Sequence, residues 1–219
     1  FTVCLINAIL KLQNRTYSKK KISEIAFEIE HHILREPVGK QDQYASALGG
    51  VNQFYFNKNN SVSVKKINLS NNSLNSLNKK LVIFFTGYSR DSYKILKYQN
   101  KQTLNLNKEM IKNLDMIKEI GKVSKKALEK KNFDEFGELM NHHWQLKKKR
   151  SSNMSNKKID YLYDYAINNG ANGGKLIGAG GGGFLMFYAN KPHQLIEAFK
   201  DKLTQLDYKF DHTGLKIIE

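Results

Sequence analysis

The sequence is poor in cysteine and has no long apolar run, and each shortage excludes a class of protein. Its single cysteine, Cys4, cannot form an internal disulfide or a cysteine-rich zinc site, and it suits a reducing compartment. No apolar run approaches the roughly 20 residues that a membrane-spanning helix needs. Residues 1–12 lack the basic start and the cleavage site of a signal peptide. We therefore expect a cytoplasmic globular protein with no membrane partner.

Two common nucleotide-binding motifs are also missing. The sequence contains no G-x-x-x-x-G-K-[ST] phosphate loop. Its one glycine-dense run is not followed directly by a helical pattern, as the dinucleotide fingerprint requires. Any nucleotide site must therefore be of another kind.

Positive charge, by contrast, is abundant. Lysine and arginine number 36 against 20 acidic residues, which gives a formal net charge of +16. Such a balance suits nucleic-acid binding, but the lysines are scattered among asparagine-rich segments and form no stripe. Only residues 147–150 form a dense cluster, which we interpret as the solvated end of a helix. We do not expect nucleic acid as a partner; a nucleic-acid binder would show salt-dependent affinity for any duplex.

Residues 36–50, EPVGKQDQYASALGG, form the first stretch that suggests chemistry. Pro37 should end the preceding helix, and Gly39 permits a tight turn. A new helix should begin next, with Asp42 in its first turn, where the helix dipole favours an ionised carboxylate. A carboxylate held ionised beside Lys40 could orient and deprotonate a substrate hydroxyl. The alternative is an N-terminal capping acid with Lys40 on a solvated face.

The second stretch is the glycine-dense KLIGAGGGGF at residues 175–184. Its flanks are apolar and strand-like, so the glycine run should be a loop between two strands. Glycines let a backbone pass close to a ligand, most simply an anion cradled by N–H groups. A flexible linker is the alternative. The residues of this loop are Gly178, Ala179, Gly180, Gly181, Gly182 and Gly183.

Together, these two stretches resemble signature regions of the GHMP kinases, a family of small-molecule kinases. Within this family, the sequence is most similar to the heptose 7-phosphate kinases of bacteria, through the segments FFTGYSR at 84–90 and LKKKRSSNMSN at 146–156. The resemblance covers essentially the whole chain. It implies an α+β, two-domain GHMP kinase fold whose N-terminal domain is truncated, since the family's phosphate loop would precede residue 1. We expect residues 1–75 to complete that domain and residues 76–219 to form the C-terminal domain, a ferredoxin-like α/β layer.

The resemblance also implies an activity. The expected reaction is phosphoryl transfer from ATP, with Mg²⁺, to the anomeric hydroxyl of a heptose 7-phosphate, for nucleotide-activated heptose and surface polysaccharide. Asp42 would act on the hydroxyl, the glycine loop would serve the nucleotide site, and Glu30 would bind Mg²⁺ unless it is only an exposed helix acid. The substrate would contact Lys40, Gln43, Thr86 and Arg90, although Arg90 could equally form a surface ion pair.

Two other functions stay open at this point. One is a kinase of another sugar, of the fucose or N-acylhexosamine type. The other is a non-catalytic fragment or binding module that lacks the phosphate loop. The sequence does not indicate an oligomeric state.

Hydrophobic periodicity predicts the secondary structure. We expect helices at 1–12, from Ser18 through the stripe that ends at Ile33, at 110–128, at 132–146, at 159–166 and at 194–206. Strands are expected at 51–56 and 61–67 around a turn at 57–60, at 81–85, on both sides of the glycine loop, and at 208–218. Residues 69–80 are polar and asparagine-rich, which suggests a boundary between domains.

Overall fold

The computed structural model describes residues 1–88 and 92–218, and its contacts divide the chain into two compact units. Unit 1 consists of residues 1–68 and a returning segment that starts at Phe210, and unit 2 consists of residues 69–209. The expected domain ranges, 1–75 and 76–219, remain a prediction about the family's domains. Within the described residues, no helix combines the length and the apolarity that crossing a membrane requires.

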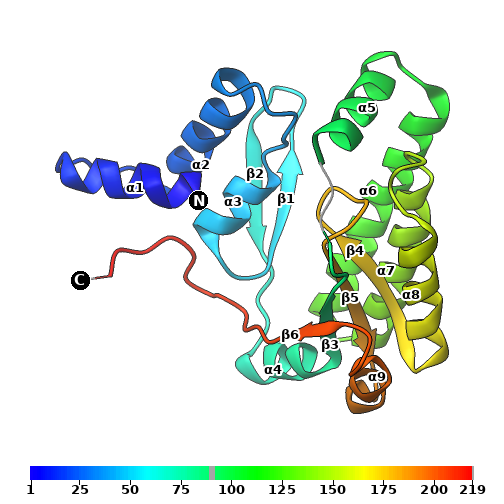
Figure 1. Cartoon of the computed structure of the whole chain (residues 1–219). Helices are drawn as coiled ribbons and strands as arrows, with labels where there is room; N and C mark the ends of the chain where they lie inside the picture. The colour runs from blue at the N-terminus through cyan, green and yellow to red at the C-terminus, as the bar shows by residue number, and fades with distance from the viewer. Residues whose placement is uncertain (89–91, 219) are drawn as a thin grey trace. The chain divides into compact units, whose positions relative to one another are not determined.

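Unit 1 is built on three α-helices and a π-helical turn (Figure 1). They are α1 (Thr2–Leu12), α2 (Lys19–Phe27), η1 (Glu28–Ile33) and α3 (Gln41–Leu48). The Ser18 hydroxyl caps α2 by accepting a hydrogen bond from the Lys21 N–H at 3.2 Å, as expected. The buried cluster consists of Val3, Ile6, Leu10, Ile22, Ala26 and Ala47.

The apolar stripe expected to end at Ile33 stops earlier. Ile33 is 68% exposed because η1 replaces the last turn of α2 with wider, i→i+5 hydrogen bonding. The Leu34 N–H, for example, donates to the Ile29 carbonyl at 2.9 Å. A wider turn rotates the following residues off the stripe. π-Helical turns often occur at functional sites, and this one contains Glu30.

Strands β1 (Asn52–Phe56) and β2 (Val62–Lys66) form the predicted antiparallel hairpin. The returning segment was predicted as a strand, which is wrong, because residues 208–218 have no strand assignment. They lie instead along the end of α3, where the Gly50 N–H donates to the Asp211 carbonyl at 2.6 Å and the Leu215 N–H donates to the Ala47 carbonyl at 2.9 Å. The approach is close enough that a Cβ at Gly214 would lie 2.5 Å from the Gly49 nitrogen.

Unit 2 contains a four-stranded sheet in the order β4-β5-β3-β6, in which every pair is antiparallel. The strands are β3 (Leu81–Phe85), β4 (Ala171–Ile177), β5 (Phe184–Ala189) and β6 (Thr204–Leu206). The chain passes from β3 through helices to β4 and β5, and then through one helix to β6. This is the ferredoxin-like βαββαβ arrangement, which confirms the predicted fold class.

The described part of unit 2 also contains six helices (Figure 1). They are α4 (Asn71–Lys80), α5 (Ser92–Leu104), α6 (Lys108–Glu129), α7 (Phe133–Lys148), α8 (Lys157–Asn168) and α9 (Pro192–Phe199). Of these helices, α4, α7, α8 and α9 contact the sheet. The Asn132 side chain caps α7: it accepts from the Glu135 N–H at 3.3 Å and donates to the Glu135 carboxylate at 2.9 Å.

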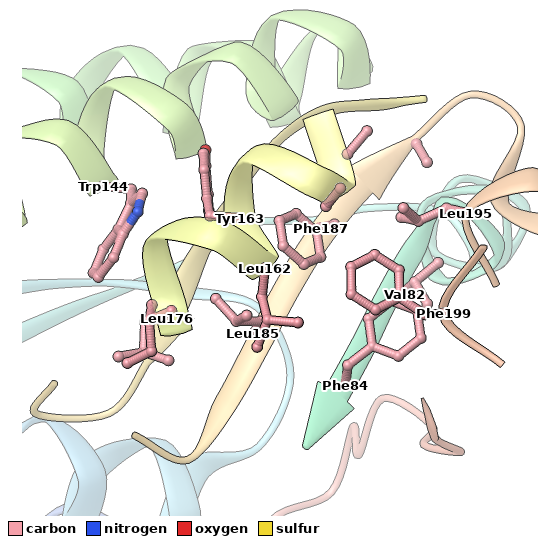
Figure 2. Packing of buried hydrophobic residues seen from close by; sticks show 14 of the residues in the cluster. Val82, Phe84, Trp144, Leu162, Tyr163, Leu176, Leu185, Phe187, Leu195 and Phe199 are labelled. Atoms are coloured by element: carbon pink, nitrogen blue, oxygen red, sulfur yellow. The ribbon is translucent and has the colours of Figure 1, made fainter. Parts of the chain in front are cut away.

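The core of unit 2 lies between the sheet and the helices α7, α8 and α9. Figure 2 shows Phe84 on β3 beside Phe199 on α9, with ring centroids 4.6 Å apart. Trp144, from α7, packs near Tyr163 of α8 at 6.1 Å between rings and is fully buried. The predicted stripe of α8, with Ile159, Leu162, Tyr163 and Ala166, is buried throughout.

Two further expectations need correction. The helix predicted over 194–206 ends at Phe199, and residues 204–206 form β6, which pairs with β3. β6 is exposed along its length, so it carries no apolar alternation that could reveal it. Residues 71–80, expected only as a polar boundary, form α4 because Ser70 caps it and Leu74 and Leu77 are buried.

Candidate functional site

In unit 1, the loop before α3 is fixed by Lys40. Its ammonium forms an ion pair with the Glu24 carboxylate at 2.7 Å and donates to the Asn60 carbonyl, also at 2.7 Å. It also lies over the Phe27 ring, 5.0 Å from the centroid, at a distance typical of a cation–π contact. Lys40 therefore ties the start of α3 to α2 and to the hairpin turn. Its charge, predicted to meet a substrate phosphate, is already engaged within the protein.

Glu24 is the centre of this network. Besides Lys40, it accepts a short hydrogen bond from the hydroxyl of Tyr44, a fully buried residue of α3. Burial opposes the charge of Glu24, but the hydrogen bonds from Lys40 and Tyr44 outweigh it and hold its pKa below the ordinary value. Burial and the Glu24 carboxylate raise the pKa of Tyr44. Asp42 is thus carried on a helix anchored by a charged network on its other side.

Asp42 itself lies exposed in the first turn of α3. This is the position predicted from the sequence, where unpaired N–H groups and the helix dipole stabilise an ionised carboxylate. Because Lys40 is bound to Glu24, no ion pair within the described residues occupies Asp42. A carboxylate in this state can accept a proton or a hydrogen bond from a hydroxyl group.

Glu30 and Gln43 are brought together although they lie on different helices. The Gln43 amide donates a short hydrogen bond to the Glu30 carboxylate. Gln43 is 3% exposed, and its Oε1 atom has no hydrogen-bond partner in the part of the chain that the structure describes. A buried acceptor without a donor is costly and points to a group that would satisfy it. Through this hydrogen bond Glu30 contacts Gln43, the residue that follows Asp42 in the sequence.

These residues allow a test of the expected Mg²⁺ site. No set of three or more His, Cys, Asp or Glu side chains in the described ranges, 1–88 and 92–218, could enclose a metal ion. Magnesium, however, is commonly held by one or two carboxylates together with substrate phosphates and waters. The Glu30 carboxylate and the unsatisfied Gln43 oxygen are hard oxygen donors of this kind. The donor set fits a magnesium ion shared with a phosphate ligand.

In unit 2, Thr86 connects the end of β3 to the glycine loop. Its hydroxyl lies 2.9 Å from the Gly183 carbonyl and 3.0 Å from the Tyr88 carbonyl as a donor, and it accepts from the Gly183 N–H at 3.1 Å. Thr86 is fully buried. Thr86 therefore fixes the start of β5 and the end of the glycine loop to the end of β3. The other residue predicted in this segment, Arg90, lies outside the described residues.

The glycine loop itself packs against two side chains. Gly180, at φ +124°, is so close to Met154 that a Cβ would lie 2.3 Å from the sulfur, and a Cβ at Gly182 would lie 3.1 Å from the ring of Tyr88. The Gly181 N–H donates to the Met154 carbonyl at 3.0 Å. The glycines therefore allow the loop backbone to pack closely against other residues of the protein, and not only against a ligand.

Three N–H groups of the loop have no acceptor among the described residues. None of the hydrogen bonds made by the described residues uses the N–H groups of Ala179, Gly180 or Gly182. Gly180 and Gly182 are buried, so their N–H groups call for an acceptor. Backbone N–H groups presented in a turn of this kind form concave anion sites.

One group of functional interest was missed by the sequence analysis. Residues 147–150 were interpreted as a solvated helix end, but Lys147 is only 7% exposed and donates to the carbonyls of Leu176, at 3.2 Å, and Gly178. The interpretation failed because the helix pattern of α7 does not reveal that β4 covers its last turn. His143, on the same helix, is also mostly covered, whereas His142 is exposed.

Comparisons with known proteins agree with this architecture. Residues 124–205 match the family described as GHMP kinases C terminal. The chain is 31% identical over 217 residues to the D-glycero-alpha-D-manno-heptose 7-phosphate kinase of Campylobacter jejuni, covering 98% of the chain and 63% of that relative. The chain thus spans less than two thirds of the relative's length.

Solved structures show the same likeness. A D-glycero-D-manno-heptose 1-phosphate kinase from Bacteroides thetaiotaomicron matches with a TM-score of 0.72 and 26% identity, over 99% of the chain and 61% of that structure. A putative sugar kinase from C. jejuni matches with a TM-score of 0.71 and 29% identity, over 98% of the chain and 62% of that structure.

Proposed function

Because residues 124–205 form a GHMP kinase C-terminal domain and the chain has the GHMP kinase fold, we propose that the protein acts in phosphoryl transfer from ATP to a sugar hydroxyl. We further propose that the acceptor is the anomeric hydroxyl of a heptose 7-phosphate and that the product is a 1,7-bisphosphate. The C. jejuni relative, a heptose 7-phosphate kinase, supports this choice. We place the reaction in the cytoplasm, in keeping with the single exposed Cys4.

The observation that carries the proposal is the ion pair between Lys40 and Glu24. This ion pair fixes the start of α3 and leaves Asp42 exposed and without a counter-charge among the described residues. A substrate hydroxyl bound there would donate its hydrogen bond to Asp42, which can take the proton as the oxygen attacks. The phosphate-binding task predicted for Lys40 would require it to leave Glu24, so we assign Lys40 a positioning role instead.

We propose that Glu30 and Gln43 contribute to binding Mg²⁺. When bound, Mg²⁺ neutralises charge on the phosphates during transfer. Gln43 holds the Glu30 carboxylate in place, and its free Oε1 would accept from a metal-bound water or a substrate hydroxyl. In unit 2, Thr86 braces the glycine loop, whose remaining N–H groups would bind phosphate oxygens.

The test is ATP turnover by the Asp42→Asn variant. The chain should be assayed as it stands and extended at its N-terminus, since it spans 63% of the C. jejuni relative's length. With heptose 7-phosphate as acceptor, we expect Asp42→Asn to lose about 100-fold or more in kcat, the usual contribution of a positioned general base. Asp115→Asn is a matched control, because Asp115 is an exposed acid on α6.

Near-normal turnover of Asp42→Asn would contradict the role of Asp42. Turnover with fucose or an N-acylhexosamine but not with heptose 7-phosphate would keep the transfer reaction and replace the substrate. A folded protein that turns over none of these sugars, even in its extended form, would favour the non-catalytic binding module.

A further inference from the structure

A group of cations without any carboxylate lies where α7 ends against β4. Lys147 and Arg150 are three residues apart, a spacing that places them on one side of the helix end. Lys147 is almost fully buried, and its ammonium donates to the carbonyls of Leu176 and Gly178, at the entrance to the glycine loop. The charge of Lys147 is therefore fixed at the root of that loop.

Lys175 belongs to the same group. Gly173, two residues earlier in β4, is pressed against α7 so closely that a Cβ would lie 2.0 Å from the Gly137 carbonyl. Side chains two residues apart in a strand share a face, so Lys175 also faces α7. Its charge acts on Lys147 and on His143, both on α7. Within the described ranges, the Lys175 ammonium has neither a hydrogen bond nor an ion pair.

Arg150 lies close enough for its charge to act on Lys147 and Lys175, and only one end of its guanidinium is held. Its Nε donates to the Asn113 side-chain oxygen at 3.3 Å, and the Asn113 amide in turn donates to the Leu146 carbonyl at 2.8 Å. These contacts orient Arg150 from α6. Among the residues that the structure describes, its two terminal nitrogens have no acceptor. They form the fork that binds a phosphate or carboxylate with two parallel hydrogen bonds.

The charges of this group are not balanced within the described protein. The neighbouring Lys148 forms an ion pair with Asp160 at 3.4 Å, but no ion pair of the described residues includes Lys147, Arg150 or Lys175. Burial and the other two cations lower the pKa of Lys147 to about 7, and burial and Arg150 lower the pKa of Lys175 to about 8. Buried charges are normally paired, so the protein keeps these cations at a cost.

A neutral donor completes the site. Burial and the surrounding cations lower the pKa of His143 to about 3, so its ring is neutral at physiological pH. The buried Nδ1 of this ring has no hydrogen-bond partner within the described residues. It can therefore take the tautomer in which Nδ1 carries a hydrogen and donates to an anion.

We propose that Lys147, Arg150 and Lys175, with His143 beside them, form a binding site for the phosphate group of a phosphate ester. A phosphate dianion supplies the missing counter-charge and has enough oxygens to accept from all of these donors. The inference does not depend on the transfer reaction, since it concerns binding alone. The phosphate can belong to a sugar phosphate or to a nucleotide, and the experiment separates the two.

The test is acylation of individual lysines with an amine-specific reagent at pH 8, followed by mass spectrometry of peptides. Without ligand, Lys175, which is only half-buried, is partly deprotonated and reactive, whereas Lys147 is too deeply buried to report. Inorganic phosphate should raise the pKa of Lys175 and cover it, so we expect about tenfold slower acylation of this lysine. Lys126, an exposed lysine of α6, should react at an unchanged rate.

Variants then locate the binding. Calorimetric titration should show phosphate binding about tenfold or more weaker in Lys175→Met and in Arg150→Gln, and unchanged in Lys126→Met, which removes the same charge. The fluorescence of Trp144, the one tryptophan in the sequence, checks that each variant is folded. If Lys175→Met fails to fold, Arg150→Gln decides.

The source of the phosphate follows from which compound slows acylation. If heptose 7-phosphate slows acylation and the unphosphorylated sugar does not, the site binds a sugar phosphate. If only ADP slows acylation, the site binds a nucleotide. Phosphate binding here in a protein that transfers nothing would support the site and contradict the proposed reaction. Acylation of Lys175 unaffected by inorganic phosphate and by both compounds, or unweakened binding in the variants, would overturn the site.

Discussion

Lys40 in unit 1 and Lys147 in unit 2 are two largely buried lysines with opposite surroundings. The Lys40 side chain is 15% exposed and residue Lys147 is 7% exposed, and both ammonium groups donate to backbone carbonyls. Lys40, however, meets the carboxylate of Glu24 at 2.7 Å. Lys147 is surrounded by the cations Lys175 and Arg150.

This difference shows that burial alone does not reveal what a lysine does. The charge of Lys40 is neutralised inside the protein by Glu24, so it needs no anionic ligand as a counter-charge. The charge of Lys147 is not neutralised within the described residues, which is the pattern expected at a site for an anion. Each of the following predictions tests whether the two lysines differ in this way.

The largest expected effect is the pH dependence of unit 2. Lys147 and Lys175 have pKa values of about 7 and about 8 in the folded chain, below the ordinary 10.5. Between about pH 7 and pH 10 the unfolded chain binds more protons, so the free energy of unfolding should rise with pH, by about 1 kcal/mol per pH unit. Urea denaturation followed by Trp144 fluorescence measures it. Above about pH 10 the trend should reverse, because burial raises the pKa values of Tyr163 and Tyr188.

Saturating phosphate and the Lys175→Met variant provide the controls for this slope. Each should flatten it, phosphate by restoring the lysine pKa values and the variant by removing one of the groups. A stability that falls steadily from pH 7 to pH 10 would show that the cluster is not destabilised by its own charge.

A smaller effect is expected from Glu24→Gln in unit 1. The variant keeps an acceptor for Tyr44 but removes the counter-charge of Lys40, so we expect α2 and α3 to lose about 2 kcal/mol of stability. Hydrogen–deuterium exchange of the amides in these helices measures the loss. The control is Glu28→Gln, an exposed acid whose ion pair with His32 should be worth less than about 0.5 kcal/mol. Equal exchange in both variants would show that Glu24 does not anchor α3.

The smallest effect should come from Lys147→Met. The variant loses two hydrogen bonds to carbonyls but also removes a buried charge repelled by its neighbours, so the unfolding free energy should change by less than about 1 kcal/mol. Lys40→Met, by contrast, should cost about 2 kcal/mol because it leaves Glu24 without its cation. Similar large losses in both variants would remove the distinction between the two lysines.

Much of the fold was predictable because local signals and packing agree. The continuous apolar run at 81–85 became a buried strand, and Ser18 and Asn132 cap helices as expected. β6 could not be predicted, because its three exposed residues are held only by pairing with β3. The exposure of Ile33 depends on a π-helical turn, for which no reliable sequence signal exists.

The position of Asp42 in the fold was predictable, whereas the contacts around the candidate site were less so. Asp42 lies in the first turn of α3, where the proline, glycine and helix pattern placed it. The partner of Lys40 could not be predicted, since Glu24 lies 16 residues away and only the packing of α2 on α3 brings it close. The cationic cluster was hidden for the same reason, because Lys175 and Lys147 meet through the contact of β4 with α7.

The returning segment of unit 1 has a consequence for synthesis on the ribosome. Gly50 and Ala47, at the end of the helix that carries Asp42, take their partners Asp211 and Leu215 from a part of the chain made about 160 residues later. All of unit 2 is translated between the two segments of unit 1, residues 1–68 and the returning segment. Unit 2 can fold as soon as it emerges, whereas the end of α3 in unit 1 lacks its hydrogen-bond partners until the returning segment has been made. A nascent chain stopped before residue 210 would therefore carry a folded unit 2 and an incomplete unit 1.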